Sequence, residues 1–254
     1  MTLDGRTIFV TGASRGAGAG IARSIAAAGG KVVIGYAKNE DAARALAAEL
    51  GDRAAGIVGA DFAEPGAAEL AWSHAQRHAR DRLDGLVLNH GVFEAASVHD
   101  DAAAWSENWA RTLQINLQSC ADLARHAARA WVDSPVNGGV KSIVAISSRA
   151  AHRGDDADHP SYAAAKAGLI AMMKTFARAY SGRGLLCYAI SPGWIDTEMA
   201  PQDPEARRRA LAEVPLGAMA DPAEIGALTA FLLSGACPSA TGATIDVNGA
   251  SYVR

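Results

Sequence analysis

The sequence predicts a doubly wound α/β fold, in which one seven-stranded parallel sheet carries helices on both faces. Short runs rich in β-branched residues alternate with longer alanine-rich stretches along the chain, as expected of repeated β-α units. The 254 residues, 50% of them hydrophobic, suffice for one large core. No internal linker interrupts the pattern, so we expect a single domain over residues 1–254.

Strands are expected at the short apolar runs that lie between turn-forming residues. In chain order they are Thr7–Thr11, Lys31–Tyr36, Ala55–Ala60, Gly85–Asn89, Val140–Ser147, Leu185–Ile190 and Thr244–Val247.

Helices are expected between these strands, where apolar residues recur with helical spacing. They are Ala17–Ala28, Asp41–Leu50, Pro65–Arg80, Asp101–Trp131, Tyr162–Tyr180, Pro204–Ala212 and Pro222–Leu233. Glu40, Pro65 and Pro222 occupy positions where helices commonly begin.

Composition argues against several classes of partner. The net charge of −3 and the pI near 6.2 leave no basic excess for nucleic acid or an anionic membrane. Cys120, Cys187 and Cys237 are odd in number and widely spaced, so we expect reduced core thiols rather than disulfides or metal ligands. The start lacks the features of a secretory signal, and no apolar run is long enough to span a membrane. We therefore expect a soluble, cytoplasmic protein.

A glycine-rich turn follows the first predicted strand and opens the first predicted helix, at Thr11–Gly18. Gly12 permits a tight turn, Gly16 lets backbone amides approach a pyrophosphate, and Gly18 permits close packing of helix on strand. The helix N-terminus adds partial positive charge. The turn therefore predicts dinucleotide binding, although a plain strand-to-helix turn has the same composition.

The end of the second strand favours NADP over NAD. Residues 35–39 contain no carboxylate that could accept hydrogen bonds from a ribose 2′-hydroxyl. Arg15 and Lys38 instead place two cations near the expected 2′ position, unless both are ordinary surface cations. Asp61, after the third strand, either accepts from the adenine amino group or caps a turn.

Tyr162 and Lys166 are four residues apart in a predicted helix, so their side chains project from one face. A nearby ammonium favours the phenolate and should move the tyrosine pKa from about 10 toward the working pH of an acid/base catalyst. The pair alone is a weak signal, because such spacing is common on helix surfaces.

Two serines strengthen this interpretation. Ser147 and Ser148 end the fifth strand, and ligand sites of open α/β sheets lie at the carboxyl ends of strands. A serine hydroxyl there can donate to a substrate oxygen that gains negative charge. We favour Ser148, with Ser147 as the alternative.

Five features in chain order resemble the short-chain dehydrogenase/reductase family, with its Rossmann-type fold. They are the glycine turn, Leu88–Gly91, Asn116, the set of Ser148, Tyr162 and Lys166, and Ser191–Thr197. The match runs from about Asp4 to Gly249. It implies hydride transfer between a nicotinamide dinucleotide and a carbonyl or alcohol substrate.

The resemblance also implies roles for single residues. Tyr162 is the general acid in the reducing direction, Lys166 holds the nicotinamide ribose, Ser148 orients the substrate oxygen, and Asn116 binds a water that links Lys166 to solvent. The residues expected to bind the coenzyme are Gly12, Ser14, Arg15, Gly16, Gly18, Lys38, Asp61, Phe62, Asn89, Gly91, Tyr162, Lys166, Pro192, Gly193, Ile195 and Thr197.

The chain departs from the family pattern in two places. His90 stands where alanine is usual, and the gap from Ser148 to Tyr162 is one residue longer than is commonest. We expect the loop His152–His159 to shape the substrate entrance rather than bind a metal, and we expect no metal site. Arg207–Arg209 should be a solvated helix face, and Trp194 lines either the substrate pocket or the core.

The expected function is NADP-dependent reduction of a small or medium carbonyl compound, with a 3-oxoacyl thioester as one substrate class. The alternatives are oxidation of an alcohol or sugar with NAD, and a dinucleotide-binding sensor that has lost catalysis. An intact set of Asn116, Ser148, Tyr162 and Lys166 argues against the sensor. We expect a homotetramer or homodimer, because helices Asp101–Trp131 and Tyr162–Tyr180 resemble those that pair across subunits in the family.

Overall fold

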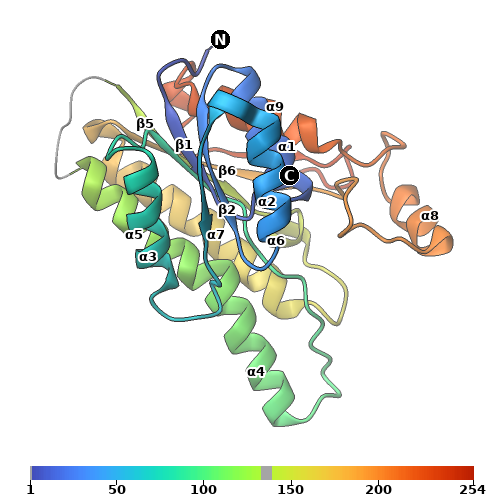
Figure 1. Cartoon of the computed structure of the whole chain (residues 1–254). Coiled ribbons are helices and arrows are strands. Elements are labelled where there is room, and N and C mark those ends of the chain that lie inside the picture. The colour runs from blue at the N-terminus through green and yellow to red at the C-terminus, as the bar shows by residue number, and fades with distance from the viewer. Residues whose placement is uncertain (1, 133–138) are drawn as a thin grey trace.

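The computed structural model describes residues 2–132 and 139–254 and confirms the expected α/β fold. One sheet of seven parallel strands runs through the molecule in the order β3-β2-β1-β4-β5-β6-β7 (Figure 1). The strands are β1 (Thr7–Val10), β2 (Lys31–Tyr36), β3 (Ala54–Gly59), β4 (Gly85–Leu88), β5 (Lys141–Ile146), β6 (Leu185–Pro192) and β7 (Thr244–Val247). All seven predicted strands are present, with ends that differ by at most two residues from the prediction.

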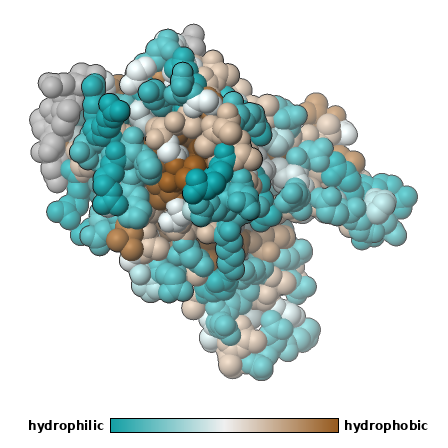
Figure 2. Space-filling view, viewed as in Figure 1, coloured by the Kyte–Doolittle hydropathy of each residue, from teal (hydrophilic) through white to brown (hydrophobic). Residues whose placement is uncertain are grey.

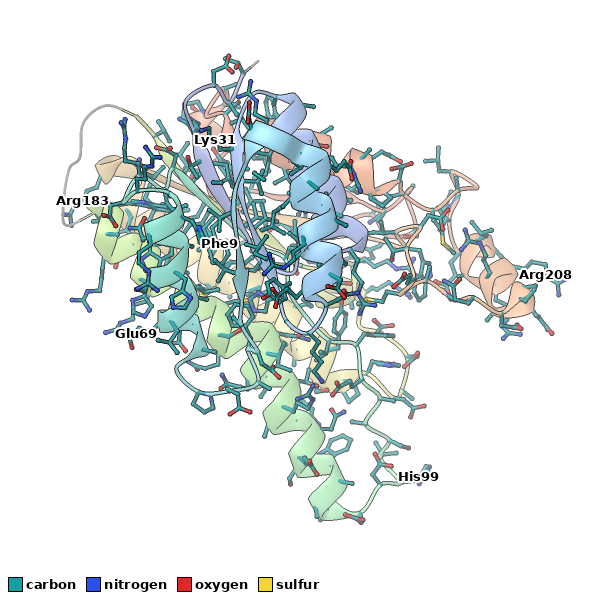
Figure 3. All side chains as sticks on the ribbon, viewed as in Figure 1. Phe9, Lys31, Glu69, His99, Arg183 and Arg208 are labelled. Atoms are coloured by element: carbon teal, nitrogen blue, oxygen red, sulfur yellow. The ribbon has the colours of Figure 1, made fainter. Side chains whose placement is uncertain are left out.

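Helices cover both faces of the sheet, because successive side chains of each strand point to opposite faces. Phe9 of β1 packs in the core beneath α3, α5 and α7, and lies near the centre of the molecule in Figure 3. Its neighbours Ile8 and Val10 pack in the opposite core, beneath α1, α2 and α9. The continuous apolar strands thus bury both of their faces.

The predicted helices all form, with small changes at their ends. They are α1 (Gly16–Ala27), α2 (Glu40–Leu50), α3 (Ala67–His78), α4 (Ala102–Leu113), α5 (Ser119–Val132), α7 (Pro160–Tyr180), α8 (Pro204–Ala212) and α9 (Pro222–Leu233). A short α6 (Ala150–Arg153) was not predicted. Pro65 does not begin a helix, since α3 starts after Gly66, whose φ of 83° lies in the left-handed region.

The long helix predicted over Asp101–Trp131 is interrupted. A π turn at Gln114–Gln118 separates α4 from α5, so one extra residue is accommodated in the helical path. Asn116 lies in this turn and is fully buried. Helical π turns occur often at functional sites, and this one redirects the Asn116 side chain toward the loop after β4.

Helix α8 projects from the body of the molecule and carries mostly hydrophilic side chains (Figures 1 and 2). Arg208 lies at its tip, while Arg207 pairs with Asp196 at 2.8 Å and Arg209 with Glu205 at 3.1 Å (Figure 3). Arg207–Arg209 therefore form a solvated, internally paired face, as predicted.

The strand order reverses between β1 and β4, which positions the ligand site. Chain segments leave these two neighbouring strands in opposite directions, and the resulting crevice at their carboxyl ends is the usual binding position in such folds. The glycine turn follows β1 and the segment Asn89–Gly91 follows β4, so both lie at this switch point.

Candidate active site

The glycine turn has the geometry that a pyrophosphate requires. Gly12 and Gly16 have φ values of 60° and 55°, which disfavour other residues. A Cβ on Gly18 would lie 2.2 Å from the carbonyl oxygen of Gly12, so only glycine allows α1 to approach the turn this closely. Among the described residues, no side chain caps the N-terminus of α1. The first amides of α1 are thus left for an anion, and the turn fits a dinucleotide.

Asn89 fixes this turn to the end of β4. Its Nδ2 atom donates to the carbonyl oxygens of Thr11 and Gly12, at 3.0 and 2.9 Å. Its backbone N–H also donates to the Thr11 hydroxyl at 3.0 Å. Asn89 therefore holds the proposed pyrophosphate turn in place, in addition to any contact with a coenzyme.

The two cations assigned to a 2′-phosphate lie on separate segments. Lys38 is exposed just after β2. Arg15 forms an ion pair with Glu198 at 2.9 Å, and both side chains are largely exposed to solvent. An ion pair this exposed adds little to the stability of the fold, so Arg15 can readily exchange Glu198 for a phosphate. Asp61 accepts a hydrogen bond from the Ala63 backbone at 3.0 Å, which is the turn-capping alternative named above.

The segment after β6 returns to the glycine turn. Thr197 lies so close to Gly16 that a Cβ on this glycine would be 3.4 Å from the Thr197 methyl group. Gly193 packs on Asn248, where a Cβ would approach the backbone to 3.0 Å. Ile195 pairs with Ala220 as an isolated bridge. The proposed nicotinamide segment is thus held from both sides next to the pyrophosphate turn.

The two adjacent serines have different partners. The Ser148 side chain favours the phenolate of Tyr162 by hydrogen bonding, and its Oγ atom accepts from the Ala150 backbone N–H at 3.1 Å. The buried Ser147 hydroxyl instead donates to the backbone carbonyl of Lys166 at 2.8 Å. Ser148 is therefore the serine that can share a substrate oxygen with Tyr162.

Lys166 lies one turn beyond Tyr162 in α7 and is almost completely buried. Its Nζ atom donates to the carbonyl oxygen of Ile146 at 2.9 Å and lies 5.7 Å from the centre of the Tyr162 ring. Burial lowers the pKa of this ammonium, while the buried Cys120 thiol nearby acts in the opposite direction.

The predicted downward shift of the Tyr162 pKa is wrong. Burial raises the pKa of Tyr162 to about 12, which outweighs the hydrogen bond from Ser148 that favours the phenolate. The charge of Asp155, in the loop between Ser148 and Tyr162, raises the pKa further. At neutral pH the phenol is protonated, which is the state required of a general acid.

Both polar atoms of the Asn116 side-chain amide form hydrogen bonds. Its Oδ1 atom accepts from the Val92 N–H and its Nδ2 atom donates to the Val92 carbonyl, both at 2.8 Å. The side chains of Asn116 and Lys166 meet at Gly91, where an added Cβ would lie 3.0 Å from Asn116 Oδ1 and 3.4 Å from Lys166 Nζ. The structure thus brings the predicted relay residues together around Gly91, where a larger residue would crowd both side chains.

Sequence reasoning missed Phe93, which borders Tyr162. Its ring meets the Tyr162 ring edge-on at 4.9 Å and stacks on His159 at 3.7 Å. The Ala96 N–H donates to the Asp158 carbonyl at 2.6 Å, so the loops after β4 and before α7 are joined beside the tyrosine. Phe93 stands in a loop without periodicity, and no sequence signal marked it.

The structure bears on three further expectations. The role of the His152–His159 loop at the substrate entrance stays a prediction; the His152 Nε2 atom lies 3.3 Å from the Ser191 hydroxyl, and its ring stacks on Tyr252. Cys237 is exposed, whereas Cys120 and Cys187 are buried free thiols as expected. Trp194 packs against the small apolar cluster of Ala200, Ala210 and Met219, and its Nε1 atom has no hydrogen-bond partner among the described residues.

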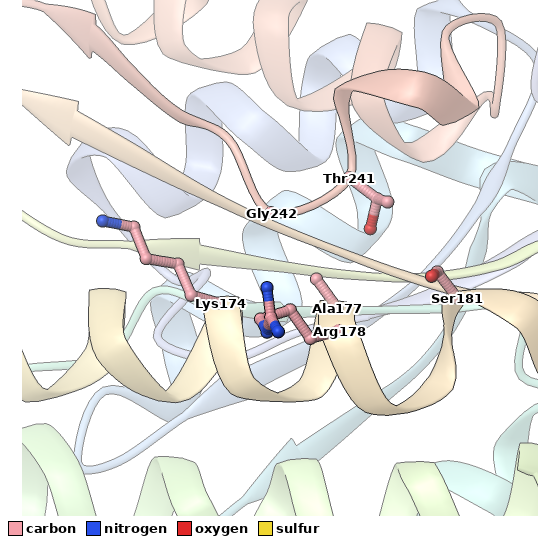
Figure 4. A pocket seen from close by; sticks show the side chains of 6 residues that line it. All are labelled: Lys174, Ala177, Arg178, Ser181, Thr241 and Gly242. Atoms are coloured by element: carbon pink, nitrogen blue, oxygen red, sulfur yellow. The ribbon is translucent and has the colours of Figure 1, made fainter.

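An open hollow with a volume of about 360 Å³ lies between the end of α7 and the turn before β7 (Figure 4). It is lined by Lys174, Ala177, Arg178, Ser181, Thr241 and Gly242. Lys174 follows Tyr162 by 12 residues, or about 18 Å along a helix. The hollow is therefore separate from the site around Tyr162.

Over residues 2–132 and 139–254, none of the helices is both long and apolar enough to cross a membrane. In the same ranges, no three His, Cys, Asp or Glu side chains are grouped so as to hold a metal ion.

Known proteins resemble this chain over its whole length. A family model described as Enoyl-(Acyl carrier protein) reductase matches residues 12–250. The 3-oxoacyl-acyl-carrier-protein reductase FabG of Vibrio cholerae is 34% identical over 254 residues, which is 100% of both chains. The L-rhamnose 1-dehydrogenase (NAD(P)(+)) of Azotobacter vinelandii is 34% identical over 263 residues, covering 100% of this chain and 99% of the relative.

Solved structures agree with these relatives. A short chain dehydrogenase from Burkholderia cenocepacia, solved in complex with NADP, superposes with a TM-score of 0.88 at 32% identity and covers 99% of each chain. The resemblance inferred from the motifs is thereby confirmed. This chain belongs to the short-chain dehydrogenase/reductase family and is an oxidoreductase acting on CH–OH or C=O groups.

Proposed function

We propose that this protein is an NADP-dependent reductase of ketones, with 3-oxoacyl thioesters as the first substrate class to test. The observation that carries the proposal is the placement of the buried Lys166 one helical turn from Tyr162, with its Nζ atom 5.7 Å from the centre of the tyrosine ring. The FabG relatives and the NADP complex support the substrate class and the coenzyme.

The proposed coenzyme fits the residues present. The glycine turn would hold the pyrophosphate, Arg15 and Lys38 the 2′-phosphate, and Ile195 and Thr197 the nicotinamide side. When bound, NADPH supplies the hydride that reduces the carbonyl carbon.

The protein's own groups handle the oxygen and its proton. The Ser148 hydroxyl donates a hydrogen bond to the substrate oxygen and stabilises the negative charge that develops there. The Tyr162 hydroxyl, protonated because its pKa is raised to about 12, donates the proton to the same oxygen. A water held at Asn116 would then pass a proton from solvent to Lys166, and Lys166 would return a proton to Tyr162.

The main test replaces Tyr162 by phenylalanine. Tyr162→Phe removes the acid and keeps the ring that packs on Phe93, so kcat for ketone reduction should fall at least about 100-fold while NADPH affinity stays within a few-fold. Tyr188→Phe is the matched control and should keep full activity, because this buried tyrosine of β6 keeps its ring and loses only a hydrogen bond to the Cys237 carbonyl. Equal activity of the two variants would refute the assignment.

Oxidation of a sugar or alcohol is the second candidate, because L-rhamnose 1-dehydrogenase is as similar as FabG. The same Tyr162 would serve as the acid in reduction and as the base in oxidation. A panel of ketones, oxoacyl thioesters, quinones and sugars, assayed with both coenzymes in both directions, separates the two. A protein that binds NADPH and turns over nothing would be a dinucleotide-binding sensor.

We further propose that the protein assembles through α5 and α7 as a homotetramer or homodimer in the cytoplasm. A hollow of about 250 Å³ on this face is lined by Arg125, Ala128, Arg129, Val132, Phe176, Tyr180 and Arg183. It combines aromatic surface with arginine, a composition typical of protein interfaces. The free thiols Cys120 and Cys187 fit a reducing compartment.

A further inference from the structure

His90 is a buried histidine whose two ring nitrogens contact hydroxyl groups from distant parts of the chain. Its Nδ1 atom lies 2.8 Å from Thr11 Oγ1, just after β1, and its Nε2 atom lies 2.8 Å from Ser119 Oγ, at the start of α5. Burial lowers the pKa of His90 to about 3, and the positive charge of Lys166 contributes. The ring is therefore neutral near pH 7, with one donor nitrogen and one acceptor nitrogen.

Counting hydrogen-bond partners decides which nitrogen carries the proton. Thr11 Oγ1 accepts the backbone N–H groups of Asn89 and His90, at 3.0 and 3.3 Å, which occupies its two lone pairs. The Thr11 hydroxyl hydrogen is therefore directed between Nδ1, at 2.8 Å, and the Val87 carbonyl, at 3.0 Å, which also accepts the Thr11 backbone N–H.

The proton consequently resides on Nε2. This N–H donates to Ser119 Oγ, whose own hydrogen goes to the Ile115 carbonyl at 2.8 Å. The Nε2 atom also lies 3.4 Å from the buried Cys120 sulfur, a weak acceptor, and each group from Thr11 through His90 and Ser119 to Ile115 then has a partner. The opposite tautomer would direct an N–H at an oxygen with no free lone pair, a costly arrangement in a buried site.

The same ring touches two further segments of the site. The Phe62 ring lies 4.0 Å from it, centre to centre. Gly12 packs on its backbone, so that a Cβ on Gly12 would be 2.9 Å from the His90 Cα. At the other end of the chain of hydrogen bonds, Ile115 and Ser119 flank Asn116, the residue of the π turn that holds the loop after β4.

We propose that His90, fixed as its Nε2–H tautomer, is a positioning residue that couples the coenzyme-binding turn to the π turn carrying Asn116. The inference rests on the proposed function for its kinetic consequence. It goes beyond that function because alanine, the residue usual at this position, has no group that could join Thr11 to Ser119.

Two variants break the connection at different points. His90→Phe keeps a ring of similar size against Phe62 and loses both hydrogen bonds. Ser119→Ala removes the acceptor of Nε2–H at a residue outside the proposed coenzyme and substrate contacts. Thr229→Val is the matched control, because the buried Thr229 hydroxyl also donates to the carbonyl four residues earlier, at 2.7 Å, within the distant helix α9.

The kinetic expectation is a loss in kcat that is not additive. His90→Phe and Ser119→Ala should each lower kcat for ketone reduction about tenfold, the equivalent of one hydrogen bond, and the double variant should be no slower than the slower single variant. The pH profile of kcat should shift in both single variants, because loss of the His90 hydrogen bonds displaces the π turn that carries Asn116. Thr229→Val should change neither. Additive losses, or lower thermal stability with an unchanged pH profile, would show a merely structural role.

Hydrogen exchange tests the coupling without any turnover. Adding NADP to the native protein should increase the protection of backbone amides in residues 114–120, and this increase should disappear in His90→Phe and Ser119→Ala but persist in Thr229→Val. No increase in the native protein, or the same increase in all variants, overturns the proposal. If no carbonyl substrate is reduced, the proposed function fails while this measurement still decides the coupling.

Discussion

The hydroxyl of Ser147 donates to the backbone carbonyl of Lys166 at 2.8 Å and so joins the end of β5 to the helix that carries Tyr162. Its neighbour Ser148 instead favours the phenolate of Tyr162. We infer that the adjacent serines have different tasks: Ser147 holds the framework and Ser148 contacts the substrate oxygen.

This division predicts opposite effects for two similar changes. Ser148→Ala should lower kcat about 100-fold, because the developing oxyanion loses a donor, with little change in stability. Ser147→Ala should reduce the free energy of unfolding by about 1 kcal/mol and leave kcat within a few-fold. Steady-state kinetics and urea unfolding of both variants measure this, and the reverse pattern would assign the substrate contact to Ser147.

Gly91 offers a test of the space between Asn116 and Lys166. Gly91→Ala places a methyl group 3.0 Å from Asn116 Oδ1 and 3.4 Å from Lys166 Nζ, so one of these side chains must move. We expect kcat to fall at least about tenfold, the effect of losing one hydrogen bond. Gly182→Ala is the control, since its Cβ would meet nothing within 4 Å. If Gly91→Ala and Gly182→Ala have equal kinetics, the reaction does not depend on the close approach of Asn116 and Lys166 at Gly91.

His90 should make the protein less stable in acid. Its folded pKa of about 3 lies below the usual value of 6.5, so the unfolded chain binds more protons between these two pH values. Stability is therefore retained above pH 6.5 and falls as the pH drops toward 3, by up to about 1.4 kcal/mol per pH unit for one proton. Denaturant unfolding between pH 7 and 4 should show a shallower slope for His90→Phe than for the native protein. An identical pH dependence of stability in the two proteins would show that groups other than His90 cause the acid sensitivity.

Arg15 and Lys38 should distinguish the two coenzymes. Replacing either by alanine should weaken NADP binding about tenfold or more, the value of a charged hydrogen bond, and change NAD binding less than twofold. Lys31→Ala is the control, because Lys31 is exposed at the opposite end of β2. Calorimetric titrations with both coenzymes provide the comparison. Equal losses for NADP and NAD would exclude recognition of the 2′-phosphate by these cations.

The α5–α7 face should control assembly. Sedimentation of the native protein should show a species two or four times the 26.2 kDa chain mass. Arg125→Glu reverses a charge on this exposed face and should shift the protein toward the monomer, whereas Arg208→Glu at the tip of α8 should not. A native protein that sediments only as the monomer contradicts the proposed assembly.

Local sequence was sufficient for the elements and for most of the site residues. The strand ends could be predicted within two residues, because a continuous apolar run between two turns is stable mainly as a buried strand. The interruption of the long helix at Gln114–Gln118 was not foreseen, because a π turn keeps the helical pattern and is recognised only from its hydrogen bonds. Phe93 was missed because its importance comes from a contact with Tyr162 across two loops.

The sequence by itself predicted the parallel α/β architecture and the glycine turn from spacing along the chain, and the set of Asn116, Ser148, Tyr162 and Lys166 with the help of the family resemblance. Tertiary structure alone decided that Ser147 bonds to the Lys166 backbone, that burial outweighs the Ser148 hydrogen bond in setting the tyrosine pKa, and that His90 joins Thr11 to Ser119. Solvation and long-range hydrogen bonds depend on segments far apart in sequence, and no local pattern encodes how closely those segments pack.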